Sequence, residues 1–213
     1  MKPIETHADI AAGLNALLES DPRLQSVAEQ AGDIPLRRRP ADFAGLAHIV
    51  TGQQVSVASA SAIFARLQDR FDPLTSDRIT MASDQDLADV GLSRPKIRTL
   101  RAVCKACHNG LSFNRLVELP ADQAHARLCE IKGIGRWSAD IFLLFCAGHP
   151  DIFPSGDLAL QIAVQKALGL EARPKPQELD EIANAWAPWR AVAARLFWSW
   201  YKAYKNSKLS LPL

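Results

Sequence analysis

The sequence predicts an all-α fold of about ten helices, in one large domain or two tightly joined lobes. Apolar residues recur at spacings of three and four along most of the 213 residues. Gly and Pro interrupt these runs, as the ends of helices require. Alternation of apolar and polar residues, which is typical of a strand, never extends beyond a few positions.

The first half of the chain shows helical spacing in segments separated by turn residues. Pro22 and residues 32–40 break the pattern after the first segment, and Gly52 and Gly91 mark later helix ends. Ser83, with Asp86 three residues on, is a near miss to a capping box. Helices are expected over residues 5–18, 43–50, about 55–70, 83–90 and about 96–108. The inward positions of the third are Val57, Ala60, Ile63, Phe64 and Leu67.

The second half continues in the same way. Pro120 and Asp122 open a helix that ends before a glycine-containing turn, and the next helix starts near Arg136. Asp157 is the expected N-cap of a helix over 157–168. Residues 177–186 form another helix, and Pro188 stands where a proline is tolerated in the first turn of the last one. Trp189, Val192, Leu196, Trp200 and Tyr204 define the inward face of that last helix.

Composition indicates a folded globular protein, because 48% of the residues are hydrophobic. A net charge of +2 is too small to indicate nucleic acid by itself, so any basic surface has to be local. The three arginines of residues 37–39 are either a solvated turn or a phosphate contact.

No apolar window reaches membrane length, and the N-terminal segment lacks a signal core, so neither a membrane span nor export is expected. We expect a cytoplasmic protein, associated with the nucleoid if the source is bacterial.

The cysteines predict no metal centre. Cys104 and Cys107 form a CxxC within a helical pattern, and no second pair or histidine cluster completes a zinc site. All four cysteines, including Cys129 and Cys146, are expected to be buried thiols in a reducing compartment.

The stretch from Lys132 to Arg136 can bind an anion. Gly133 and Gly135 allow a sharp turn, and small residues leave the first amides of the next helix accessible at the positive end of its dipole. A phosphodiester fits such a site, with Ile134 in the turn and the charges of Lys132 and Arg136 beside it. The alternative is a plain tight connection between two helices.

The sequence LCEIKGIGRWSADIFLLF, followed by FPSGD, resembles the helix–hairpin–helix, Gly/Pro-rich loop and aspartate of the HhH-GPD superfamily of DNA glycosylases. The stretches IVTGQQVSVASASAIFARL, DVGLSRPKIRTL and WAPWRAVAARLFWSWY resemble its 3-methyladenine DNA glycosylase II (alkylbase) branch. The resemblance covers roughly residues 40–205. It implies one unit over 1–213 with two helical lobes around a cleft. Lobe one is about 40–150, with the hairpin motif at 121–146, and lobe two is about 1–39 with 151–213.

The resemblance also implies a mechanism. The enzyme would flip a damaged base out of double-stranded DNA, and Asp157 would stabilise the positive charge that builds on the sugar. Asp157 could instead serve only as a helix cap. Trp137 and Trp189 match aromatic pocket positions, where an indole attracts a cationic alkylated purine, although both could be ordinary core residues. Two further pocket positions fall at Ile141 and Leu158, a departure that leaves the substrate range open.

The loop containing Gln53 and Gln54 matches the family's wedge, with Gln54 at the position that fills the gap left by the flipped base. A polar turn is the alternative. Trp137 stands where lyase members carry a lysine, so a monofunctional glycosylase without lyase activity is expected. No iron–sulfur cluster is expected, because no cysteine follows Cys146. A monovalent cation, sodium or potassium, could bind the main-chain carbonyls of three residues, which are Cys129, Ile131 and Ile134.

Three functions remain open at this point. The first is release of alkylated purines such as 3-methyladenine by a monomeric enzyme. The second is a glycosylase for a deaminated, oxidised or 1-methyladenine-type base. The third is a hairpin protein that binds DNA without catalysis. A pure DNA binder has no need for the combination of Asp157 with pocket tryptophans.

Overall fold

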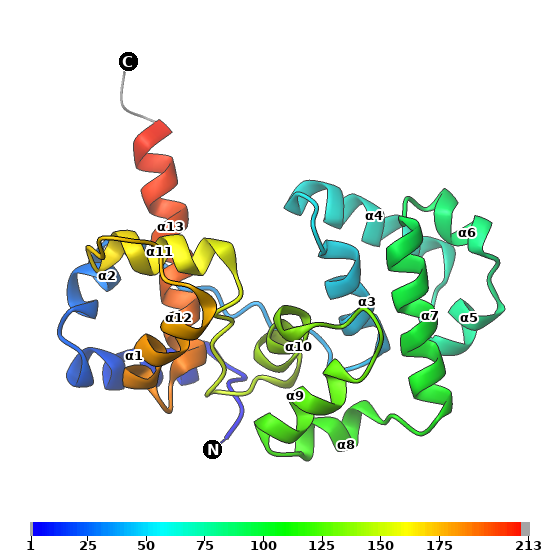
Figure 1. Ribbon diagram of the computed structural model, residues 1–213, viewed down its shortest axis with the longest axis horizontal. Helices are drawn as coiled ribbons and strands as arrows, with labels where there is room; N and C mark the ends of the chain where they lie inside the picture. Colours follow the sequence, from blue (N-terminus) through cyan, green and yellow to red (C-terminus); the bar gives the residue numbers. More distant parts are fainter. Residues whose placement is uncertain (1, 210–213) are drawn as a thin grey trace. The chain divides into compact units, whose positions relative to one another are not determined.

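The computed structural model describes residues 2–209, with side chains described as far as residue 207. Over these residues the chain forms thirteen α-helices, a π-helical segment and a short 3-10 turn, without a strand (Figure 1). The prediction of an all-α fold is therefore confirmed. In the described part of the chain, no helix has both the length and the apolar character needed to cross a membrane.

The chain divides into two compact units, and each is described by itself. The first, the hairpin unit, is Arg39–Ala147. The second, the terminal unit, joins the described residues up to Arg38 to those from Gly148 onward.

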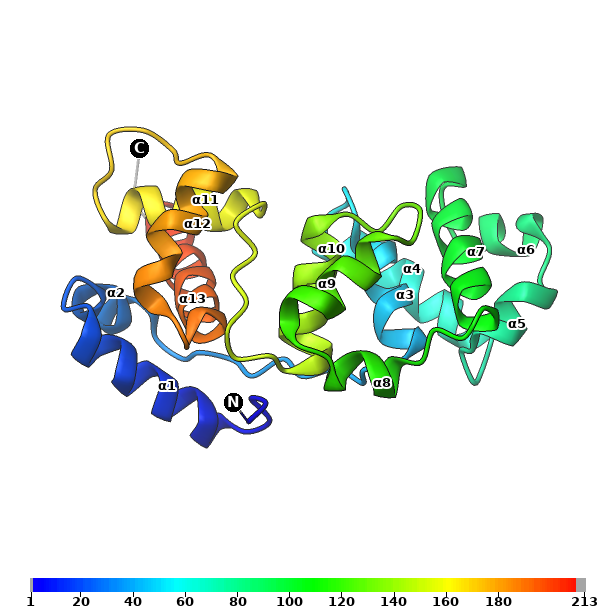
Figure 2. The same ribbon diagram turned by 60° about the horizontal axis from the view of Figure 1, so that its bottom comes forward.

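The hairpin unit is built around α3 and α7. Helix α3 packs against α4, α7 and α10, and α7 also packs against α5 and α6 (Figures 1 and 2). Lys96 of α7 is buried and donates from Nζ to the Thr51 carbonyl of α3 at 2.6 Å. The helices are α3 (Phe43–Gly52), α4 (Val57–Arg70), α5 (Ser76–Met81), α6 (Asp84–Asp89), α7 (Arg94–His108), α8 (Phe113–Glu118), α9 (Ala121–Cys129) and α10 (Arg136–Phe142), which continues into the π-helix η1 (Leu143–Ala147).

The terminal unit is built around α13. Figures 1 and 2 both show this helix among α1, α2, α11 and α12. Trp186 is fully buried and lies against Phe153 and Phe197, with ring centroids 5.3 and 4.9 Å away. Its indole N–H donates to the buried Asp21 at 3.1 Å, so the core tryptophan has its polar atom satisfied. The helices are α1 (His7–Ser20), α2 (Leu24–Ala31), α11 (Leu158–Ala167), α12 (Pro176–Ala183) and α13 (Arg190–Leu209), with the 3-10 turn Asn184–Trp186 before α13.

Several expectations need correction. Val57 was expected inward but is 85% exposed, because it begins the first turn of α4 and burial starts only at Ala60. Pro188 does not occupy the first turn of the last helix, because α13 begins at Arg190. Ser83 and Asp86 form a complete capping box, so the aspartate performs the role usually taken by glutamate.

The cysteines also differ from the expectation of four buried thiols. Cys104 and Cys146 are buried, but Cys107 is only half-buried and Cys129 is exposed. Cys129 is the last residue of α9, where the chain leaves the helix and turns.

Candidate functional site

The helix–hairpin–helix motif consists of α9, a turn over residues 130–135, and α10. Gly133 has a φ of +92°, and a Cβ there would lie 2.0 Å from Thr99 Oγ1 of α7. A side chain at Gly133 is therefore excluded both by the backbone conformation and by the close approach of α7. Gly133 shapes the turn.

Gly135 has a different role. It is the N-cap of α10 with φ −98°, and no atom lies within 4 Å of where its Cβ would be. Neither conformation nor packing requires glycine here, so its effect is to leave the start of α10 uncovered. Gly135 also gives α10 no side-chain cap, whereas α1, α3, α4, α5, α6, α8 and α11 each have one. The exposed Lys132 and Arg136 add positive charge beside this helix end.

The turn between α3 and α4 is tied to this hairpin. Gln53 Nε2 donates to the Gly133 carbonyl at 3.2 Å and to Ser138 Oγ at 2.9 Å. Gln53 thus links the α3–α4 turn to the hairpin turn and to α10. Its neighbour Gln54 is exposed and has a φ of +55°, a conformation that costs a non-glycine residue energy and is often found at functional sites.

A carboxylate lies between the two hairpin helices. Asp140 of α10 is 5% exposed, and its Oδ1 is 3.3 Å from His125 Nε2 of α9, an ion-pair distance. Arg136 Nε lies 3.7 Å from Asp140 Oδ2. The contact with Asp140 raises the pKa of His125 above its ordinary value, although partial burial acts in the opposite direction. This pair joins α9 to α10.

Trp137 and Ile141 stand one turn apart on α10, and both are half-buried. Their spacing of four places them on one face of the helix. Trp137 lies two residues after Gly135, in the first turn of α10.

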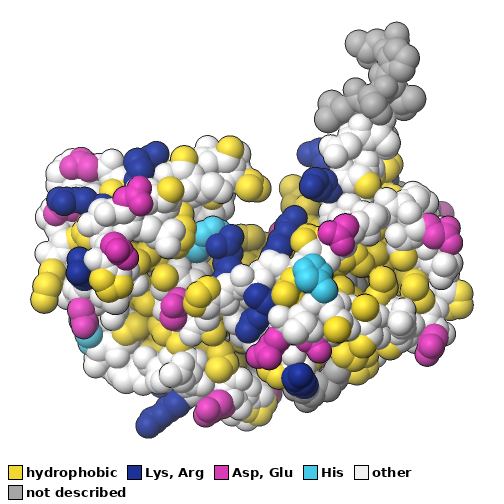
Figure 3. All heavy atoms as spheres, turned by 180° about the vertical axis from the view of Figure 1, so that it is seen from behind, with side chains coloured by type: hydrophobic (Ala, Val, Ile, Leu, Met, Phe, Trp, Pro, Cys, Tyr) yellow, Lys and Arg dark blue, Asp and Glu magenta, His cyan; other side chains and the backbone are white. Residues whose placement is uncertain are grey.

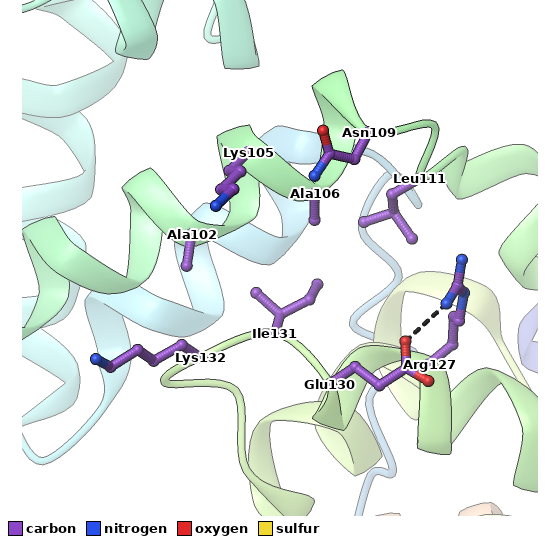
Figure 4. Close-up of a pocket in the computed structure, with 9 residues that line it drawn as sticks. All are labelled: Ala102, Lys105, Ala106, Asn109, Leu111, Arg127, Glu130, Ile131 and Lys132. Atoms are coloured by element: carbon purple, nitrogen blue, oxygen red, sulfur yellow. Dashed lines mark hydrogen bonds and ion pairs between the residues drawn. The ribbon is translucent and has the colours of Figure 1, made fainter.

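A hollow of about 320 Å³ opens beside the hairpin, between α7 and the turn (Figure 4). Ile131 and Leu111 give it apolar walls, and Lys105 and Lys132 lie toward one end. Arg127 and Glu130 line the other end and form an ion pair at 2.7 Å. The charged lining residues are Lys105, Arg127, Lys132 and Glu130, so this flank of the hairpin is positively charged.

The predicted cation ligands are main-chain oxygens of the last residue of α9, Cys129, and of Ile131 and Ile134 in the turn. Neutral carbonyl oxygens are suitable ligands for sodium or potassium, and the residues concerned are close in sequence. The Ile131 carbonyl already accepts the Ile134 N–H at 2.9 Å, and its second lone pair can still take part. The chemistry of these donors is therefore compatible with such an ion.

Asp157, in the terminal unit, is held at two points. It is the N-cap of α11, as predicted, and its Oδ1 accepts the Leu160 N–H at 3.1 Å. The same oxygen accepts the indole N–H of Trp198 of α13 at 3.2 Å. Because these donors come from separate helices, the half-buried carboxylate has a fixed orientation.

The loop before Asp157 is also held in place by hydrogen bonds. Ser155 is fully buried, and its hydroxyl donates to Asp180 of α12. The Ser155 carbonyl accepts Gln161 Nε2 at 2.9 Å, and the Asp157 N–H donates to the Pro154 carbonyl at 2.8 Å. The backbone that presents Asp157 is consequently part of the packed unit.

Trp198 was not among the site residues predicted from the sequence. Trp189, which was predicted to line the base pocket, contacts α1. A Cβ on Gly13 of α1 would lie 2.6 Å from the Trp189 ring, so this tryptophan packs against α1. Trp198 lies off the inward face that includes Leu196 and Trp200, and a tryptophan off the core face is the signal that could have identified it. Leu158, next to Asp157, is 55% exposed.

Comparison with known proteins agrees with these features. The chain matches the family model for the HhH-GPD superfamily base excision DNA repair protein over residues 47–188. It is 24% identical over 196 residues to an alkylbase DNA glycosidase-like protein of Schizosaccharomyces pombe, a match covering 88% of this chain and 92% of that protein.

Two further similarities extend this result. The chain is 33% identical over 210 residues to a probable bifunctional transcriptional activator/DNA repair enzyme AlkA of Mycobacterium tuberculosis. That match covers 90% of this chain but 40% of the relative, so the chain spans less than half of that protein's length. The crystal structure of a DNA-3-methyladenine glycosidase from Bacillus halodurans superposes with a TM-score of 0.78 at 28% identity, covering 97% of this chain and 94% of that one.

Proposed function

Since the chain belongs to the HhH-GPD superfamily of base excision DNA repair proteins, we propose that it is a DNA glycosylase that releases alkylated purines such as 3-methyladenine. The observation that carries this proposal is the fixed carboxylate of Asp157, held by Leu160 and Trp198. A protein that only binds DNA has no need to orient a carboxylate in this way. The names of the similar proteins support the choice of alkylated bases.

The hairpin is the proposed DNA-binding element. The uncovered start of α10 at Gly135, the exposed Lys132 and Arg136, and the turn shaped by Gly133 suit the negative charge of a phosphodiester. Such contacts position the DNA without reading its sequence. Gln54, exposed and in a strained conformation, is the proposed wedge that enters the space left by the flipped nucleotide.

In the proposed reaction, water replaces the damaged base on the sugar. The bond between the base nitrogen and C1′ breaks, and its electron pair leaves with the base. Positive charge builds on the sugar, and the negative Asp157 stabilises it as it forms. The oxygen of a water then bonds to C1′, and the carboxylate accepts the released proton. Because an alkylated purine is cationic, it departs readily, and a moderate catalyst is sufficient.

Tryptophans supply the proposed attraction for the cationic base. An indole face attracts a cation by about 0.5–2 kcal/mol. We assign this role to Trp137 and add Trp198, whose ring lies next to the reacting carboxylate. Trp189 stays a prediction as a pocket residue. The sequence-predicted pocket positions Ile141 and Leu158 carry aliphatic side chains, which offer no aromatic face to a cation.

The test is a panel of duplexes that contain 3-methyladenine, hypoxanthine, 1-methyladenine or 8-oxoguanine, assayed under single-turnover conditions. The proposal expects the fastest release from the duplex with 3-methyladenine. Faster release of an oxidised or deaminated base would replace the proposed substrate. Binding to every duplex without release of any base would indicate a DNA-binding protein instead.

We also propose that the enzyme has no lyase activity, because Trp137 offers no amine at the position where a nucleophilic lysine would stand. Borohydride should then trap no covalent adduct with DNA, and the product should be an intact abasic site. A trapped adduct would contradict this part of the proposal. A sodium or potassium ion on the carbonyls of Cys129, Ile131 and Ile134 would add positive charge beside the phosphate.

A further inference from the structure

A second hollow lies in the terminal unit, and Asp157 is not among its lining residues. It has a volume of about 380 Å³ and is formed by the loop after α2 and one face of α13. Figure 3 shows Lys and Arg side chains, in dark blue, on the part of α13 that leads to its C-terminal end. The lining residues are Ala31, Asp33, Pro35 and Arg37 from the loop side, with Ser199, Lys202, Ala203 and Asn206 from α13.

The lining carries donors that the described part of the chain leaves without hydrogen bonds or ion pairs. Arg37, Lys202 and Asn206 are exposed, and Ser199 is 9% exposed. A guanidinium, an ammonium, an amide and a hydroxyl are the groups that commonly bind phosphate oxygens. Asp33 is the single acid among the lining residues, so positive charge is in excess.

A buried arginine lies along the same face of α13. Arg195, one turn before Ser199, is 2% exposed and donates to the Ala191 carbonyl at 3.0 Å and to the Leu36 carbonyl at 3.4 Å. Burial, together with the nearby charges of Arg38 and Arg37, lowers its pKa to about 10. Like charges have thus been brought together around this face, and a bound anion would offset their repulsion.

The backbone of Arg37 gives an independent indication. Its φ is +50°, a conformation that few non-glycine residues adopt and that costs of the order of 1 kcal/mol or more. The carbonyl of the preceding residue, Leu36, accepts a hydrogen bond from the buried Arg195, which ties this part of the loop to α13. The strained residue is therefore held in place, and its side chain lines the hollow.

From these observations we propose that the hollow between Arg37 and Lys202 is a phosphate-binding site. The phosphate could belong to the DNA backbone or to a free phosphate compound, since the same donors serve both. The site is independent of Asp157, so its test does not depend on base release.

The test measures thermal unfolding in inorganic phosphate, with sodium chloride adjusted to keep the ionic strength constant. Binding to the folded state should raise the wild-type Tm with increasing phosphate. The double variant Arg37→Ala/Lys202→Ala should lose this rise. The matched control Lys166→Ala/Arg173→Ala, which removes two exposed charges of the same unit outside the hollow, should keep it. An equal rise in all three proteins, or none in the wild type, would overturn the proposal.

Two further measurements complete the design. Lys202→Glu reverses one exposed charge on α13 and should abolish the phosphate response even if the double variant folds poorly. Binding to an abasic duplex across a salt series identifies the source. A salt slope smaller by about one in the double variant indicates a DNA phosphate, because each neutralised phosphate contributes about 0.9. An unchanged slope with a lost phosphate response indicates a free phosphate compound.

Discussion

At the residue scale, the two hairpin glycines have separate tasks. Gly133 is fixed by its positive φ and by Thr99, whereas the space around Gly135 is open. The sequence predicts a turn with both glycines but cannot distinguish them, because the difference depends on α7, which is far away in the chain. Because of this difference, we expect substitution of Gly133 to affect stability and substitution of Gly135 to affect DNA binding.

Gly133→Ala should destabilise the fold by more than about 1 kcal/mol, since it adds strain and a clash with Thr99.

Gly135→Asp should leave the free energy of unfolding equal or raise it by a few tenths of a kcal/mol, because aspartate is a favourable N-cap. The same aspartate should weaken binding to every duplex, with a smaller salt slope. Thermal unfolding and duplex titration measure both effects, and a Gly135→Asp protein that binds DNA normally would contradict the proposed clamp.

Asp157 shows what a sequence can and cannot predict about a single residue. Its N-cap position is confirmed, and its proposed role comes from the resemblance to the family. The hydrogen bond from Trp198 could not be predicted, because it joins residues 41 positions apart on different helices. Side chains that approach in three dimensions leave no local pattern.

At the element scale, the long helices were predictable, whereas three of the shorter ones were not. Helix α2 and the six-residue helices α5 and α8 are absent from the predicted set. About two turns of helix provide few repeats, so the period is hard to recognise. The last two are instead marked by their N-caps, Thr75 and Ser112, which accept backbone N–H groups of the first turn.

The link between the α3–α4 turn and the hairpin can be tested at Gln53. Gln53→Ala removes two hydrogen bonds and should lower the free energy of unfolding by about 1–3 kcal/mol. Gln54→Ala is the matched control for stability, since Gln54 is exposed, and it should instead weaken binding to an abasic duplex. Equal stability of the two variants would show that Gln53 does not support the hairpin.

The His125–Asp140 pair predicts a pH dependence of the joined helices. The pKa of His125 is raised in the folded state, so its stabilising effect is complete below about pH 6.5 and is lost as the pH rises through the folded pKa. Wild type should therefore lose more stability between pH 6 and pH 9 than His125→Gln. Comparing the two proteins isolates His125 from the other histidines. If the stability of the two proteins changed with pH in the same way, the His125–Asp140 pair would not be the cause of the pH dependence.

At the scale of the whole molecule, the fold class followed from the helical period and the family from a few motifs. The helix count rose from about ten to thirteen in the described residues only through short elements. Exposure was harder to predict, as Val57 and Cys129 show, because it depends on where a helix end meets solvent. The phosphate site on α13 depends on a loop and a helix that are distant in sequence, so the arginine run alone left its role open.

The central claim is that Asp157 acts in catalysis and not only as a helix cap. In Asp157→Asn, the amide oxygen could still accept the hydrogen bonds from Leu160 and Trp198, so the substitution removes the charge while it keeps the cap. The measurement is the single-turnover rate of 3-methyladenine release from a methylated duplex by wild type and Asp157→Asn. We expect Asp157→Asn to lose about 100-fold or more of this rate, with duplex affinity and Tm unchanged. Release by the variant at a rate close to that of wild type would contradict it.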